Sequence, residues 1–274
     1  MAVESSSLPW DSAFLGRSPA FDVLRLACAG LDLTGWPSAS SLSEAAARRE
    51  PAPVSQAGRP IRFAAQVAED GLSYETRIHN TGTVLCRECD WHDFMNALTW
   101  MNFPRAKAML NSRHIEAMRD EVPGQRGRLR DALTVFDEGG VVVCSTDAEV
   151  LADIRAFRWR QLFWQRRQHF IDSTRVFVFG HAMHQKLLEP FIGVSALALL
   201  MPVAKDFPSL LLPAQLRAVD DWTAAQWADV ARIRTPQDLA PLPLLGVPGW
   251  FAQNQHESFY DNAAYFRPGR GRAV

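Results

Sequence analysis

The residues best suited to chemistry lie in one stretch of the chain, residues 89–114, which reads CDWHDFMNALTWMNFPRAKAMLNSRH. Pro104 divides this stretch into two expected helices, because proline suits the first turn of a helix but interrupts its interior. On the first helix, His92 and Asn96 share a stripe with Phe103. A solvated face seldom carries such an aromatic side chain. We therefore expect the stripe to face a cleft, with His92 and Asn96 as buried polar groups that need partners.

Asp93 has both a structural and a chemical interpretation. Asp90 is the expected N-cap of the first helix, which places Asp93 at the third helical position of a capping-box pattern. A carboxylate at that position is also favoured by the helix dipole. Alternatively, Asp93 orients a catalytic histidine, and the sequence leaves both interpretations open.

On the second helix, Lys107, Asn111 and His114 fall on one face, at steps of four and three residues. Together with Arg105, they would suit the binding of a small anionic group. A solvated surface stripe explains the same spacing, so the pattern alone does not establish a binding site.

A second candidate region is the segment TRVFVFGHAMHQK, which predicts a buried strand, a glycine and then a helix. His181 would begin that helix beyond the carboxyl end of the strand, where ligands bind in open sheets. His184 follows three residues later, and Lys186 lies close. The two histidines could hold a divalent metal ion, although zinc would need further ligands from elsewhere. The alternative is a capping His181 and an exposed His184.

The segment RLRDALTVFDEGG contributes a third group of polar residues. We expect Arg130 and Asp131 to precede a strand and residues 137–140 to form the turn of a hairpin. Asp137 and Glu138 are then interpreted as turn formers. If Asp131 lay near either histidine, the two side chains would form a general acid–base pair.

These segments predict a mostly helical α+β single domain with a small sheet built from hairpins and one buried strand. Residues 1–10 are an expected loose leader, residues 11–235 the domain, and residues 236–274 an extended tail held on the domain by aromatic side chains. A hairpin is expected from residues 74–79 and 83–86 around the sequence NTG. Helices are expected near residues 19–29, 38–50 with Ser41 or Ser43 as N-cap, 147–170 with Asp147 as N-cap, 181–190 and 220–234.

Composition excludes several classes of protein. The chain has 274 residues and a formal net charge of -1, so no overall charge predicts nucleic-acid or membrane binding. No apolar run approaches the roughly 20 residues needed to span a bilayer. The basic aromatic segment at residues 155–167 can serve a core face with arginines around it. Four cysteines suit a reduced compartment, and we expect a cytoplasmic protein.

Four motifs together resemble a bacterial family catalogued as domain of unknown function 3025: WHDFMNALTWMNFPRAKAMLNSRH, RLRDALTVFDEGG, FGHAMHQKLLEPFIGVSALAL and PLPLLGVPGWF. The resemblance covers residues 9–267. It implies a bacterial, cytosolic, full-length unit, and it implies no activity or cofactor. The polar residues in its recurrent motifs are His92, Asp93, Asn96, Lys107, Asn111, His114, Arg130, Asp131, Asp137, Glu138, His181 and Lys186.

We therefore hypothesise a hydrolase-like enzyme that uses acid–base or metal-assisted chemistry on a small anionic substrate. His92, Asp93 and Asn96 would meet His181 across a cleft, with one histidine as general base and Asp93 or Asp131 orienting it. The expected substrate-binding residues are Arg105, Lys107, Asn111, His114, Arg130 and Lys186. The alternative is a non-catalytic protein that docks a protein or nucleic-acid partner through residues 155–167 or the aromatic tail. The sequence does not specify the oligomeric state.

Overall fold

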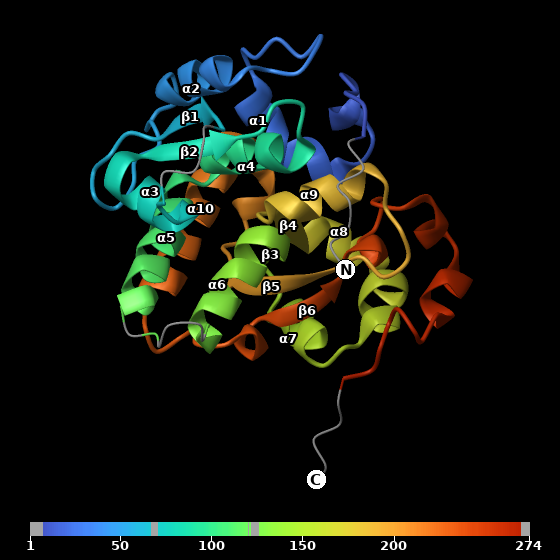
Figure 1. Cartoon of the computed structure of the whole chain (residues 1–274). Helices are drawn as coiled ribbons and strands as arrows, with labels where there is room; N and C mark the ends of the chain where they lie inside the picture. The colour runs from blue at the N-terminus through green and yellow to red at the C-terminus, as the bar shows by residue number, and fades with distance from the viewer. Residues whose placement is uncertain (1–7, 67–70, 120, 122–125, 270–274) are drawn as a thin grey trace.

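A computed structural model describes residues 8–66, 71–119, 121 and 126–269. This part of the chain forms a mostly helical α+β domain, as the sequence predicts (Figure 1). Within these residues the main sheet has four strands in the order β4-β3-β5-β6. None of the helices in the same ranges is both long and apolar enough to cross a membrane.

The main sheet is mixed. Strand β3 (Gly140–Ser145) pairs antiparallel with β4 (Thr174–Val178) and parallel with β5 (Ser195–Pro202), and β5 pairs antiparallel with β6 (Ala240–Pro243). Every residue of β3 is buried, as its run of valines favours. The strand predicted to be buried on both faces, β4, is an edge strand, and β3 and β5 occupy the two inner positions.

Five helices that pack on one another carry many of the residues of the two pockets described below. They are α4 (Trp91–Asn102), α5 (Pro104–Arg119), α6 (Arg128–Gly139), α9 (His181–Leu188) and α10 (Leu212–Ala228). Helix α4 packs on α9, α6 packs on α5 and α9, and α10 lies beside α5 (Figure 1). The predicted pair of helices meeting at Pro104 is confirmed, with Asp90 as the N-cap of α4.

The hairpin expected around the sequence NTG is wrong. Tyr74–Thr81 forms a helix, α3, because Ser73 caps its first turn and Gly82 ends it in the left-handed region at φ 73°. Strand β2 (Thr83–Cys86) pairs instead with β1 (Arg62–Ala65), in parallel. Helix α2 (Ala39–Ala47) covers β1, and Ser38 caps α2 rather than Ser41 or Ser43.

The second expected hairpin is also wrong, and this error moves a functional residue. Residues 137–139 are the last turn of α6, and β3 begins directly at Gly140. Ala132, Leu133 and Phe136 are buried at helical spacing, and this amphipathic pattern outweighs the turn-forming sequence DEGG. Asp137 therefore projects from a helix and not from a turn.

The long helix predicted for residues 147–170 is interrupted. Asp147 caps α7 (Ala148–Arg155) as expected, but Phe157 adopts a positive φ of 58° and ends the helical path. The chain resumes as a π-helical turn (Gln161–Gln165) and α8 (Arg167–Ser173). Near the N-terminus, the helix expected at residues 19–29 is the 3₁₀ helix η2 (Pro19–Leu24) followed by the short α1 (Arg25–Cys28).

Residues of the expected tail make tertiary contacts with the sheet region. Residues 240–243 supply strand β6, and the Tyr265 hydroxyl donates to the Val194 carbonyl at 2.6 Å. The aromatic rings of Phe259, Tyr260 and Phe266 pack against one another with centroids 5.2–5.5 Å apart. These contacts join residues 240–266 to the rest of the described chain through buried aromatic rings.

Gly180 permits the close approach of α9 to the end of α6. A Cβ at this position would lie 2.4 Å from the Glu138 carbonyl oxygen. We predict that Gly180→Ala lowers the free energy of unfolding by about 2 kcal/mol, because overpacking at a rigid backbone contact forces the helices apart. Gly35→Ala is the matched control, since its Cβ would meet no heavy atom within 4 Å. Equal unfolding midpoints in urea for the two variants would contradict this account.

Candidate functional site

A pocket of about 400 Å³ lies between α3, α4, α5, α6 and α9, and we call it the histidine pocket. Its lining combines several titratable side chains with a few apolar atoms. The lining residues are Gln66, Tyr74, Glu75, Arg77, Leu85, Arg87, His92, Asp93, Asn96, His114, Thr134, Asp137, Glu138 and His181.

His92 and His181 meet at the wall of this pocket. Their Nε2 atoms lie 3.0 Å apart, and the rings cross nearly edge to face at 78°. Both residues stand in the first turn of a helix, His92 in α4 and His181 in α9. His181 is 5% exposed, whereas His92 is more open to the pocket. At this distance one imidazole donates its N–H and the other accepts.

A buried ion pair lies beside the two histidines. Lys107 Nζ is 2.6 Å from Asp137 Oδ1, and their side chains are 3% and 16% exposed. Lys107 also donates to Asn96 Oδ1 at 3.0 Å and lies over the Trp100 ring. Asn96 in turn donates to the Tyr74 hydroxyl at 2.8 Å. The interpretation of Lys107 as part of a solvated stripe is therefore wrong, because its ammonium group is fully engaged inside the protein.

Asp137 connects the ion pair to the histidines. Its Oδ2 lies 3.8 Å from His181 Nδ1. Burial lowers the pKa of His181 to about 3, although the charge of Asp137 opposes this shift. Burial alone would raise the pKa of Asp137, but the Lys107 ammonium group holds it below its ordinary value. At neutral pH the site thus holds a neutral His181 beside an ionised Asp137.

The opposite wall is formed by α3 and α5. Glu75 Oε2 accepts from Asn111 Nδ2 at 2.6 Å, and Glu75 Oε1 lies 3.8 Å from His114 Nε2. Burial raises the pKa of Glu75 to about 7 and lowers the pKa of His114 to about 4. Asn111 and His114 are therefore buried partners of Glu75, so the solvated-stripe interpretation is wrong for them too.

Asp93 lines the histidine pocket, but its oxygens are directed to Arg87. Asp93 Oδ2 accepts from the backbone N–H of Arg87 at 2.7 Å and from its Nε at 2.8 Å. Its own N–H donates to Asp90 Oδ1, as an N-cap requires. This geometry gives Asp93 a structural role at the start of α4.

Four predicted residues lie away from the histidine pocket. Asp131 projects from α6 rather than preceding a strand and pairs with Arg126 at 3.1 Å, so it does not form the expected pair with a histidine. Arg130 pairs with Glu121, Arg105 pairs with Asp221, and Lys186 is exposed on α9.

His184 is not the exposed partner of His181 that the sequence suggested. It is completely buried, its Nε2 lies 3.2 Å from the Val178 carbonyl, and its ring stacks on Phe21. Across the described residues, no three or more His, Cys, Asp or Glu side chains are grouped so that they could hold a metal ion.

Among the residues that sequence reasoning did not assign to the site are Tyr74, Glu75 and Asp137. Tyr74 and Glu75 were assigned to a hairpin, and Asp137 to a turn. The pattern of Ser73 followed by a polar helical turn, and the buried spacing of α6, are the patterns that could have placed all three on helices.

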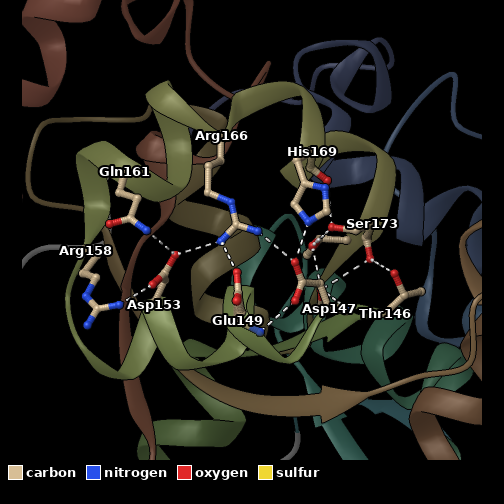
Figure 2. Close-up of polar contacts among 11 residues, drawn as sticks. Thr146, Asp147, Glu149, Asp153, Arg158, Gln161, Arg166, His169 and Ser173 are labelled. Atoms are coloured by element: carbon tan, nitrogen blue, oxygen red, sulfur yellow. Dashed lines mark hydrogen bonds and ion pairs between the residues drawn. The ribbon is translucent and has the colours of Figure 1, made fainter.

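The basic aromatic segment at residues 155–167 uses its arginines within the molecule. Arg158 pairs with Asp153 and Arg166 pairs with Asp147 (Figure 2). The nitrogen–oxygen distances of these pairs are 3.0 Å and 2.9 Å. Arg167 donates to the Asn254 carbonyl at 3.0 Å. Because these guanidinium groups bind acceptors within the protein, fewer of them are free to contact an external partner.

The fold and the histidine pocket together define a class: a mostly helical α+β domain with a pocket of titratable side chains beside a buried ion pair. The chain belongs to the family described as Protein of unknown function (DUF3025), whose model matches residues 61–270. No curated protein and no solved structure gives a significant match to the chain.

Removal of Lys107 should leave the Asp137 carboxylate buried without a counter-charge. We predict that Lys107→Met lowers the free energy of unfolding by about 3 kcal/mol in urea titrations. The double variant Lys107→Met, Asp137→Leu should recover most of this loss, because both charges are then absent. Lys205→Met, at an exposed lysine, is the control and should change stability by less than about 0.5 kcal/mol. If the loss of stability in the double variant equalled the sum of the losses in the two single variants, the two charges would not interact, and the buried pair would be contradicted.

Acidification should destabilise the protein below about pH 6. Burial lowers the pKa of His181 and His184 to about 3 and that of His114 to about 4, from 6.5. Between these values the unfolded chain binds protons that the folded chain does not. The free energy of unfolding therefore falls by up to about 1.4 kcal/mol per pH unit for each histidine.

Glu75 and Asp220 oppose this trend, because burial raises their pKa values to about 7, from 4.5 and 3.8, so below pH 7 the folded chain binds the extra protons. The net slope should nevertheless be positive between pH 5 and 6 in urea titrations. His184→Gln should reduce that slope by about 1.4 kcal/mol per pH unit, because the unfolded variant no longer binds one of the extra protons. If the free energy of unfolding of the unmodified protein rose between pH 6 and pH 5, the lowered pKa values of the buried histidines would be refuted.

Proposed function

We propose that the protein is an enzyme that performs general acid–base catalysis, of the hydrolytic kind, on a small polar molecule bound in the histidine pocket. His92 is the group that exchanges a proton with substrate or water. The observation that carries the proposal is the 3.0 Å contact between His92 and His181, with Asp137 behind His181.

The proposed tautomers rest on the surroundings of each ring nitrogen, because His181 Nδ1 makes no hydrogen bond within the described residues but lies 3.8 Å from the Asp137 carboxylate. Asp137, ionised, favours a proton on His181 Nδ1, which leaves His181 Nε2 as an acceptor. His92 then donates from Nε2, and its Nδ1 carries the free lone pair. When His92 Nδ1 takes a proton, His181 and Asp137 stabilise the resulting positive charge. His181 is thus a positioning residue, and His92 is the proposed base.

The charges of the lining bear on the substrate. The lining carries the carboxyl groups of Glu75, Asp93, Asp137 and Glu138 and the guanidinium groups of Arg77 and Arg87. Arg87 pairs with Asp93, and the arginines predicted to hold an anion, Arg105 and Arg130, pair with Asp221 and Glu121. Lys107 is engaged by Asp137. This balance supports a neutral or cationic substrate over the small anion that the sequence suggested. A location in the bacterial cytoplasm stays a prediction from the sequence.

The competing function is a non-catalytic protein that docks a partner through residues 155–167. The internal ion pairs of Arg158 and Arg166 count against it, because an external partner would have to compete with Asp153 and Asp147 (Figure 2). The catalytic proposal requires no such rearrangement.

The proposal is tested by following turnover in a fractionated extract of small molecules by mass spectrometry. The unmodified protein should consume at least one component, and His92→Gln should slow that turnover by about 100-fold or more. Glutamine keeps a hydrogen-bonding group beside His181 but cannot exchange a proton at neutral pH.

His256→Gln is the matched control, because His256 is exposed and lies outside the lining of the histidine pocket. This variant should keep the unmodified rate. Equal turnover by His92→Gln and the unmodified protein, or no turnover of any component by the unmodified protein, would count against an acid–base enzyme.

A further inference from the structure

A second pocket, which we call the arginine pocket, has a volume of about 230 Å³ and lies where the end of α2, the α4–α5 junction and α10 meet. It shares no lining residue with the histidine pocket. Its charged lining residues are Arg48, Arg49, Glu50, Arg105, Arg217, Asp220 and Asp221.

Four of these charges already have structural partners, and one of them is Arg48, which pairs with Glu44 at 3.7 Å on the surface. Arg105 pairs with Asp221 at 2.5 Å. Asp220 is buried and accepts from the backbone N–H groups of Arg105 at 3.1 Å and Ala106 at 2.8 Å. Asp220 thereby caps the start of α5 from a different helix, so the amides at that end are not available to a ligand.

Arg49 and Arg217 have no carboxylate partner anywhere in the described ranges. Arg49 donates from Nη1 to the Leu26 carbonyl at 3.2 Å. Its other guanidinium N–H groups have no acceptor among the described residues. Burial lowers the pKa of Arg49, which reflects the cost of holding this cation away from water. A partly desolvated guanidinium without a counter-charge favours a bound anion.

Asn102 adds an unused acceptor beside these cations. Its side chain is 4% exposed, and Nδ2 donates to the Val23 carbonyl at 2.8 Å. Its Oδ1 is buried and lacks a hydrogen-bond partner within the described part of the chain. A ligand that carries a hydroxyl group next to its anionic group would supply the missing donor.

We propose that the arginine pocket binds the phosphate group of a compact small molecule. Arg49 and Arg217 hold the phosphate oxygens, Arg48 contributes at the exposed rim, and Asn102 Oδ1 accepts from a neighbouring hydroxyl. The pocket volume of about 230 Å³ suits a phosphate group with a short hydroxylated carbon chain. This site is independent of the proposed catalysis at His92.

The test is isothermal titration calorimetry of the full-length protein with inorganic phosphate and with glycerol 3-phosphate at low ionic strength. Both should bind, glycerol 3-phosphate more tightly, and added salt should weaken both. Arg49→Gln and Arg217→Gln should each raise the dissociation constant by about tenfold or more, because each removes a charge-assisted contact. Arg234→Gln is the charge-matched control and should change nothing, since Arg234 lies outside this lining.

Arg217 is exposed, so its variant is expected to fold even if Arg49→Gln does not, and thermal unfolding checks both. Vesicles of phosphatidylglycerol distinguish a lipid headgroup from a free ligand. Binding to vesicles without binding of glycerol 3-phosphate would overturn the small-molecule assignment. Absent phosphate binding, or equal dissociation constants for Arg217→Gln and Arg234→Gln, would overturn the site itself.

Discussion

The ion pair between Lys107 and Asp137 is the interaction on which the histidine pocket depends. Removing two charges from water costs several kcal/mol per ion, so such a pair persists only where further polar contacts support it. Asn96 accepts a hydrogen bond from the ammonium group, and His181 faces the second carboxylate oxygen. The pair thereby joins α5 to α6 and links both to α4 and α9. Because these four helices carry the side chains of the pocket, an altered charge at Lys107 would disturb the arrangement as a whole.

The backbone places the histidines with little freedom. Strand β4 ends at Val178, and α9 begins at His181 after a two-residue connection. Gly180 lets this connection approach the end of α6 closely enough for His181 to lie beside Asp137. His92 arrives from the first turn of α4, which packs on α9. The far end of α4 and the start of α5 contribute to the arginine pocket, so the α4–α5 pair serves two separate sites.

Helical periodicity was enough to predict much of this arrangement. It placed Lys107 on one face with Asn111 and His114, and it indicated that His92 faces another part of the protein. Periodicity could not decide whether such a helix face is exposed to solvent or buried, because that depends on which element packs against it. Asp137 was missed because the sequence DEGG is typical of turns, whereas a buried apolar stripe keeps these residues helical. The partners of His181 are tertiary contacts between segments far apart in sequence, which spacing does not encode.

The central claim is that burial keeps His181 neutral beside an ionised Asp137, so that His92 carries the reactive lone pair. The most direct measurement is two-dimensional ¹H–¹⁵N NMR of the imidazole nitrogens, recorded as the pH is lowered. The account predicts that His181 stays neutral, with one protonated nitrogen, from neutral pH to well below pH 6, as a pKa of about 3 requires. Titration of His181 with a midpoint near its ordinary pKa of 6.5 would contradict the account.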